Sequence, residues 1–187
     1  MSYIHTPQPG DILAVVGGGL GGYLVNVGQA LANKPSLGTH VVVVTHQDAK
    51  GRWIGIDGRP GGVALVDCTQ YLNDSRVRSN YLQPRDNSHG QLPIFLAGCT
   101  KSLGLQYDWA GIAEDASKIV APDLSGAIDD LWRWPDPKSG LLPGHVVCSS
   151  LAAMLYEDVG WSHPSLGHER VCLPSDWWNW NDGQGWL

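Results

Sequence analysis

The residues THVVVVTHQDAKGRWIGIDGRPGGV, numbered 39–63, are the most strongly patterned part of the chain. The run from Thr39 to Thr45 holds four consecutive valines, which favour a strand that is buried on both faces. Polar residues follow from His46 to Gly51, and the run from Arg52 to Asp57 is again apolar and β-forming. We therefore expect an antiparallel hairpin at the centre of the protein.

The hairpin predicts which side chains meet across it. If the turn is centred between Asp48 and Ala49, His40 is paired directly with Asp57 on one side of the sheet. Directly opposed Cβ atoms lie about 5 Å apart, which is close enough for a hydrogen bond between carboxylate and imidazole. The alternative is that His40 only begins the strand and Asp57 only opens the turn at Gly58.

Shorter segments with strand or helix patterns surround the hairpin, so the sequence predicts a single α+β domain over residues 1–187. A chain of this length suits one domain. We expect strands at 12–16, 63–66 and 80–83, helices at 23–32, from Thr69, at 92–103, 108–120 and 151–159, and a covering loop rich in Pro, Gly and Asp at 124–144.

The composition excludes several classes of protein. Apolar residues make up 43% of the chain, which is enough for a sizeable core. The net charge is −6 without a run of like charges, and this argues against a nucleic-acid partner. No apolar run approaches the ~20 residues of a membrane span. No secretory signal is visible, so we expect a location in the cytoplasm or in a phage particle; the oligomeric state stays open.

A glycine cluster, GGGLGG at 17–22, follows the first predicted strand. We expect it to be a flexible loop before a helix. A nucleotide-binding loop is the alternative, but such loops carry a Lys-Ser/Thr pair or an acidic residue about 20 positions on, and neither is found here.

Four cysteines lie at positions 68, 99, 148 and 172 without a C-x-x-C pair, so we interpret them as reduced thiols and expect no structural zinc site. Cys148 stands where Val146-Val147 leads into a predicted helix. The N-terminus of a helix stabilises thiolate, the nucleophilic form, and its unpaired N–H groups stabilise an oxyanion. The alternative is a small buried apolar residue, as most free cysteines are.

A thiolate enzyme needs a base, usually histidine, and a group that orients it. His40 is the one of seven histidines that a predicted strand holds rigidly, and Asp57 is the orienting group that the hairpin offers. His145 is near Cys148 in sequence, but neighbours on an extended segment point in diverging directions. The remaining histidines are expected at the surface: His5, His46, His89, His163 and His168.

Tryptophan is concentrated at the end of the sequence, with four of nine in the last eleven residues. Residues 174–187 are therefore expected to be a Trp-rich tail. We favour a tail that packs on its own domain, and stacking on sugar rings or apolar ligands is the alternative.

Five short motifs occur in a characteristic order: Pro9-Gly10-Asp11-Ile12-Leu13, Thr39-His40-Val41-Val42-Val43, Ile56–Val63, Tyr107-Asp108-Trp109 and Val147–Leu151. This order resembles that of the circularly permuted NlpC/P60 papain-like cysteine hydrolases, the YiiX-like group, in which histidine precedes cysteine. The resemblance spans about residues 9–160. Thr39, Asp57 and Ser150 depart from it, since the family more often has Ser, Glu and Glu there.

The resemblance implies a papain-like fold, with a small antiparallel sheet packed against the helix that carries the cysteine. It implies Cys148 as nucleophile, His40 as base, Asp57 as the third polar residue and Tyr107 as a residue lining the substrate cleft. The implied enzyme is a cysteine hydrolase or acyltransferase that acts on a peptide, amide or acyl-ester substrate, including peptidoglycan, and needs neither metal nor organic cofactor. The alternative is a catalytically inactive binding or structural module of a phage or cell envelope.

Overall fold

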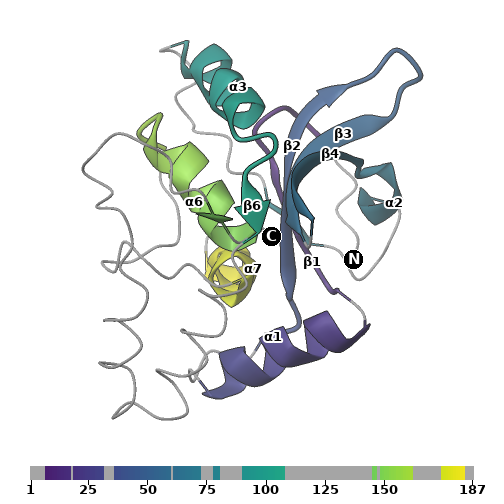
Figure 1. Cartoon of the computed structure of the whole chain (residues 1–187), viewed down its shortest axis with the longest axis vertical. Coiled ribbons are helices and arrows are strands. Elements are labelled where there is room, and N and C mark those ends of the chain that lie inside the picture. Colours follow the sequence, from purple (N-terminus) through teal and green to yellow (C-terminus); the bar gives the residue numbers. More distant parts are fainter. Residues whose placement is uncertain are drawn as a thin grey trace.

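The computed structural model describes residues 7–17, 19–31, 36–59, 61–72, 78–80, 90–107, 145–146, 148–161 and 174–183. These residues form an α+β structure around one antiparallel sheet. Figure 1 shows the sheet edge-on, with helices α3, α6 and α7 against one face, α2 against the other and α1 at one end. The expected α+β class with a small antiparallel sheet is thus confirmed.

The main sheet has five strands in the order β4-β3-β2-β1-β5, and every neighbouring pair is antiparallel. A separate pair of short strands, β6 and β7, is parallel. The strands are β1 (Ile12–Val15), β2 (His40–Gln47), β3 (Trp53–Arg59), β4 (Gly62–Asp67), β5 (Arg78–Asn80), β6 (Gln106–Tyr107) and β7 (His145–Val146).

The helices among the described residues are short, and most begin close to where the sequence predicts them. They are α1 (Gly19–Leu31), α2 (Thr69–Leu72), α3 (Gln91–Lys101), α6 (Cys148–Glu157) and α7 (Pro174–Gly183). Gly160, at a positive φ of 71°, follows the last turn of α6, as expected for a residue that ends a helix. No helix in these segments is long and apolar enough to cross a membrane.

The valine run of β2 explains why both faces of the sheet are covered. Successive side chains of a strand point to opposite faces. Val41 and Val43 therefore pack with α6 and its neighbours, whereas Val42 and Val44 join a second cluster on the other face, which includes Cys68. All four valines are buried, as the sequence predicts.

The β2–β3 hairpin forms, but the expected direct pairing of His40 with Asp57 is wrong. The register pairs Gln47 with Trp53 at the turn and, after a bulge between Val44 and His46, Val43 with Ile56. Continued by one residue, it sets Asp57 opposite Val42. His40 and Asp57 are therefore offset diagonally across the two strands, beyond the last paired residues Val43 and Ile56.

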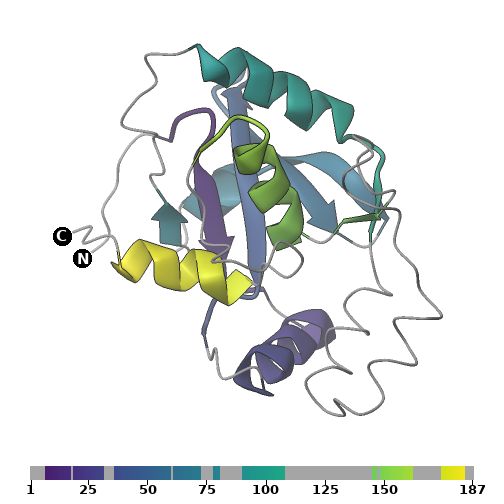
Figure 2. The same cartoon turned by 90° about the vertical axis from the view of Figure 1, so that its left-hand side faces the viewer.

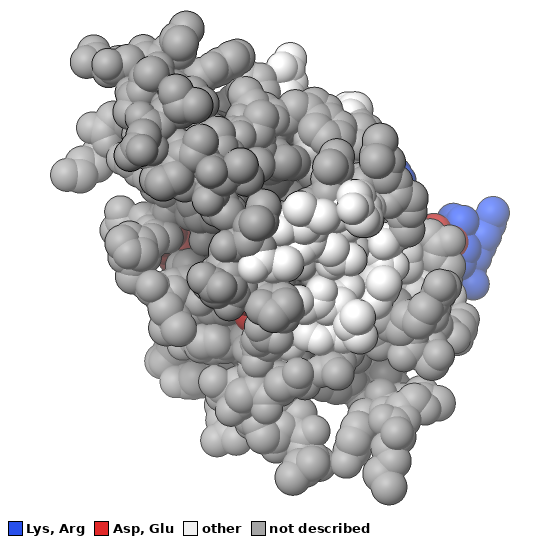
Figure 3. Space-filling view, turned by 90° about the horizontal axis from the view of Figure 1, so that it is seen from below, with Lys and Arg blue, Asp and Glu red and all other residues white. Residues whose placement is uncertain are grey.

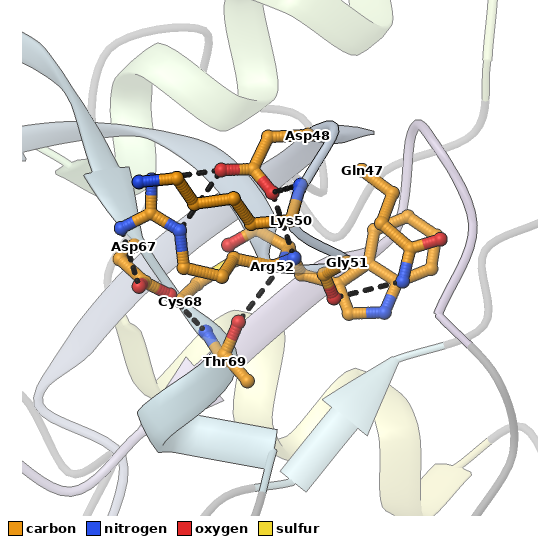
Figure 4. A network of polar contacts seen from close by, with 9 residues as sticks. Gln47, Asp48, Lys50, Gly51, Arg52, Asp67, Cys68 and Thr69 are labelled. Carbon is orange, nitrogen blue, oxygen red and sulfur yellow. Dashed lines mark hydrogen bonds and ion pairs between the residues drawn. The ribbon is translucent and has the colours of Figure 1, made fainter.

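The turn itself explains this shift of register (Figure 4). The Asp48 carboxylate accepts hydrogen bonds from the backbone N–H groups of Lys50 and Arg52, and it also pairs with the Arg52 side chain at 2.7 Å. Gly51 supplies a positive φ of 77°. These contacts hold a turn of five residues, Asp48 to Arg52, which is centred at Lys50 rather than between Asp48 and Ala49 as expected.

The glycine cluster is not the flexible loop that we expected, because α1 begins at Gly19 rather than near Tyr23. Its glycines allow close packing of the chain on itself: a Cβ on Gly22 would lie 2.4 Å from the Gly17 carbonyl oxygen. The helix carries no charged residue, and the described surface seen from its end of the molecule is largely uncharged (Figure 3).

Two further expectations change with the structure. Instead of the strand expected at 80–83, the structure has strand β5 at Arg78–Asn80. Residues 174–183 of the Trp-rich tail form helix α7. Trp177 and Trp178 of this helix are buried in the core beside α6. The helix expected at 108–120, the loop expected at 124–144, and Cys172 lie outside the described residues.

Candidate active site

His40 lies on the central strand β2 and Asp57 on its neighbour β3, and the two side chains form a close ion pair. The His40 Nε2 atom is 2.7 Å from Asp57 Oδ1, and the two side chains are 21% and 2% exposed. The ring N–H does not point straight at Oδ1, so this oxygen has no partner at the distance and angle of a regular hydrogen bond. The contact is therefore a short, charge-assisted pair with a bent hydrogen bond.

Cys148 is the first residue of α6 and is nearly buried, at 5% exposed. Its side chain lies within hydrogen-bonding reach of the His40 ring. Because Nε2 of the ring is turned toward Asp57, Nδ1 is the ring nitrogen left for the sulfur. The structure thus brings together the three residues that the sequence analysis selected.

The protonation of His40 reflects both of these neighbours. Burial of the ring lowers the pKa of His40, but the negative charge of Cys148 and the hydrogen bonds to Asp57 and Cys148 outweigh it, with a further contribution from the charge of Asp57. The net result is a pKa well above the usual 6.5. Imidazolium is therefore the favoured form of His40.

Helix α6 is seated firmly on the sheet, and this fixes the position of Cys148. Leu151, Ala152, Leu155 and Tyr156 are all buried on its inner face. The Tyr156 hydroxyl donates a 2.5 Å hydrogen bond to the Gly10 carbonyl oxygen, next to β1. In Figure 2, α6 runs along β2 on this face of the sheet. The nucleophile candidate and the base candidate are thus carried by two elements packed directly on each other.

Thr39 and Gly17 hold the start of β2, and the sequence analysis did not identify either as part of the site. The Gly17 N–H donates to Thr39 Oγ1 at 2.5 Å. A Cβ on Gly17 would lie 2.8 Å from that oxygen and 3.9 Å from the Cβ of His40. The Thr39 hydroxyl therefore accepts a backbone hydrogen bond directly before His40. Since the Gly17 N–H is hydrogen-bonded to Thr39, it is not free to bind a phosphate group.

Tyr107, expected to line the substrate cleft, lies on β6. The parallel pairing with β7 sets Tyr107 beside Val146, two residues before Cys148. The tyrosine is half-buried and makes a polar or ring contact of its own. Its backbone position is thus next to the segment that leads into α6.

The other described cysteines differ from Cys148 in their surroundings. Burial raises the pKa of Cys68 to about 12 and that of Cys99 to about 12. The Cys68 thiol donates to the Trp53 carbonyl oxygen at 3.2 Å. Cys68, Cys99 and Cys148 are all free thiols, in line with the expectation of reduced cysteines, and neither Cys68 nor Cys99 has a histidine among its electrostatic partners.

The remaining histidines provide no competing site among the described residues. His46 is exposed, and its Nδ1 lies 3.0 Å from the hydroxyl of Thr45. His145 lies on β7, and its side chain is not among those described. His5, His89, His163 and His168 lie outside the described residues.

Comparison with known proteins adds no family to this picture: no protein-family model matches the chain, and neither does any curated protein. The chemistry of the site therefore has to be argued from its own geometry. A buried thiol, an imidazole and a carboxylate in series are groups that can form a covalent acyl intermediate and transfer protons to and from it.

Proposed function

We propose that the protein is a cysteine hydrolase or acyltransferase that cleaves an amide or ester bond. Cys148 is the nucleophile, His40 the general acid and base, and Asp57 the group that orients and charges the ring. The observation that carries the proposal is the position of one imidazole between the Asp57 carboxylate and the Cys148 thiol. Such a series has the roles of nucleophile, base and orienting group that define catalytic triads.

The first half of the reaction forms an acyl-enzyme. The Cys148 thiolate attacks the carbonyl carbon of the substrate and forms a carbon–sulfur bond, and the carbonyl oxygen becomes an oxyanion. When the oxyanion collapses, the bond to the leaving nitrogen or oxygen breaks. The His40 imidazolium gives its proton to this leaving group, which departs as an amine or an alcohol.

The second half releases the acyl group. Neutral His40 now accepts a proton from water or from an acceptor alcohol or amine, whose oxygen or nitrogen attacks the thioester carbon. The carbon–sulfur bond breaks, and the Cys148 thiolate beside the His40 imidazolium is restored. Water as the attacking group gives hydrolysis, and another acceptor gives acyl transfer.

The start of α6 supports stabilisation of the oxyanion. The first N–H groups of a helix have no partner within the helix, and Cys148 is the first residue of α6. An oxyanion that forms on the substrate carbonyl next to the sulfur lies at the positive end of the helix dipole.

The fold supports a papain-like enzyme of the permuted NlpC/P60 type. An antiparallel sheet carries the histidine, a helix that begins with the cysteine packs on that sheet, and the histidine precedes the cysteine in the chain. Within this proposal Tyr107 lines the substrate cleft. Peptide amides, including those of peptidoglycan, and acyl esters are the substrate classes to assay.

Selective alkylation tests the proposal. Iodoacetamide at pH 6, followed by peptide mapping, should label Cys148 at least tenfold faster than Cys68 or Cys99, because thiolate is the reactive form and those two thiols stay protonated. The variant His40→Asn should lose this preference. Uniform slow labelling of all three would favour the inactive binding module instead.

Turnover tests the chemical role directly. Cys148→Ser should fold like the wild type and lose activity on every peptide, ester or lipid substrate that the wild type cleaves, because a serine alkoxide is much harder to form than a thiolate. Wild-type turnover by this variant would show that Cys148 is not the nucleophile.

A further inference from the structure

Helix α7 contacts the nucleophile helix close to Cys148. The indole Nε1 of Trp177 donates a 3.2 Å hydrogen bond to the carbonyl oxygen of Ser149, the residue after Cys148. Trp177 is fully buried, and its ring meets that of Tyr156 edge-on, with centroids 5.4 Å apart. In both Figure 1 and Figure 2, α7 crosses near the end of α6 that carries Cys148.

The same helix contacts the segment that leads into His40. Trp178 packs so closely on Gly38 that a Cβ on this glycine would lie 2.7 Å from the indole Cε3 atom. Trp178 is itself buried. Adjacent residues of α7 therefore contact the two catalytic elements: Trp177 the start of α6, and Trp178 the approach to β2.

Gln29 of α1 ties these contacts together. Its side-chain Nε2 donates to the Gly38 carbonyl oxygen at 3.0 Å, and its Oε1 accepts from the Ser175 N–H at 2.7 Å. The side chain is buried, so both hydrogen bonds are made away from water. One amide thus links the approach to His40 with the first turn of α7.

We propose that Trp177, Trp178 and Gln29 are positioning residues that set the approach of Cys148 to His40. The proposal rests on the proposed function, because it concerns the same thiolate–imidazolium pair. The strength of such a pair depends on separations of less than an ångström. The two partners come from segments more than 100 residues apart in the chain, and α7 contacts both of those segments.

The test compares Trp177→Phe with Trp161→Phe in the full chain. Both tryptophans belong to the same aromatic cluster, and both indoles donate one hydrogen bond, that of Trp161 to Gln91 Oε1 at 2.8 Å. Only Trp177 bonds to the first turn of α6. The two variants should therefore lose similar stability but differ at the active site.

The readout is the rate of Cys148 alkylation between pH 4 and 9. A weaker ion pair should lower the rate at pH 6 by roughly fivefold in Trp177→Phe and shift the acid limb of the profile to higher pH, which is the loss expected for about one hydrogen bond. Trp161→Phe should keep the wild-type profile. A merely structural role would change the two profiles equally, or change neither, and either result overturns the proposal.

A second variant covers the case in which Trp177→Phe does not fold. Trp178→Phe keeps an aromatic ring at Gly38 but alters its fit, and it should shift the acid limb in the same direction. An unchanged profile in Trp178→Phe overturns the proposal. Failure of the proposed function is a separate outcome, since it would appear in the wild type as an absence of preferential Cys148 labelling.

Discussion

At the scale of single residues, the charge state of His40 links the site to the stability of the fold. Its raised pKa means that the folded protein holds the ring proton to a higher pH than the unfolded chain does. The stabilisation is therefore fully present below about pH 6.5 and is lost as the pH rises through the raised value. The same proton is the one that the proposed mechanism gives to the leaving group.

The variant Asp57→Asn tests this link. The amide has nearly the shape of the carboxylate but no charge, so the pKa of His40 should fall and turnover should drop by about 10²-fold or more. A titration of the His40 ring by NMR should show the lower pKa directly. Arg59→Gln is the control: its Nε lies 4.0 Å from Asp57 Oδ2 on a side chain that is half exposed, and it should change both quantities much less.

Asp11 shifts stability in the same direction as His40, but over a lower range of pH. Burial raises the pKa of its carboxyl from 3.8 to about 7, although a hydrogen bond from the Gln8 N–H to its Oδ2 lowers it. Between these two values the unfolded chain loses a proton that the folded protein keeps, so this residue stabilises the fold less as the pH rises from about 4 to about 7. The difference between the two pKa values corresponds to at most about 4 kcal/mol of unfolding free energy.

Replacing Asp11 by asparagine should remove its contribution to the pH dependence of stability. Asp11→Asn keeps a carbonyl oxygen for the Gln8 N–H but has no charge to bury. Urea unfolding at pH 5 and pH 8 should therefore show a smaller loss of stability between the two pH values in the variant than in the wild type. Glu157→Gln, at an exposed position, should leave the difference as it is in the wild type. An equal pH dependence in Asp11→Asn would contradict the assignment to this carboxyl.

At the scale of elements, α6 is joined to the sheet by both apolar packing and one buried hydrogen bond. The Tyr156 hydroxyl and the Gly10 carbonyl oxygen are 146 positions apart in the sequence and are shielded from water. Burial also raises the pKa of Tyr156 well above its usual value, with smaller contributions from Asp11 and Cys99. The hydroxyl thus stays protonated and remains a donor in alkaline solution.

Tyr156→Phe should destabilise the protein by about 1–3 kcal/mol, because it leaves the Gly10 carbonyl oxygen buried without its donor. Denaturant unfolding measures the change. Tyr71→Phe is the matched control on α2, at a position that is half-buried against the other face of the sheet, and it should cost less. If Tyr156→Phe left the unfolding free energy unchanged, apolar packing alone would hold α6 on the sheet.

At the scale of the whole molecule, the core contains elements from both ends of the chain. Ile12 of β1, Leu151 of α6 and Trp177 of α7 belong to one apolar cluster. Trp177 and Trp178 of the Trp-rich segment are therefore part of the interior.

Trp177→Ala should cost about 3–5 kcal/mol of unfolding free energy, the range for removing a large buried aromatic side chain. Tyr23→Ala is the control, since Tyr23 on α1 is 64% exposed, and it should change stability by less than about 0.5 kcal/mol. Chemical denaturation of both variants measures the difference. Similar costs for the two would mean that α7 contributes little to the core.

The sequence by itself determined the features that depend on local pattern. Four consecutive valines specify a strand covered on both faces, and the return at Trp53 specifies the hairpin. The placement of Cys148 at the start of a helix follows from an apolar run that meets Ser149-Ser150-Leu151. Each of these signals extends over only a few neighbouring residues, so no long-range contact is needed to read it.

Only the tertiary structure decided how these pieces meet. The backbone N–H groups of Lys50 and Arg52 donate to the Asp48 carboxylate and centre the hairpin turn at Lys50, and this register, together with the bulge in β2, places Asp57 diagonally to His40. The contacts of α7 with Ser149 and Gly38 join residues that no local pattern connects. Contacts of this kind depend on how side chains fill one shared volume, and that filling is a property of the folded chain as a whole.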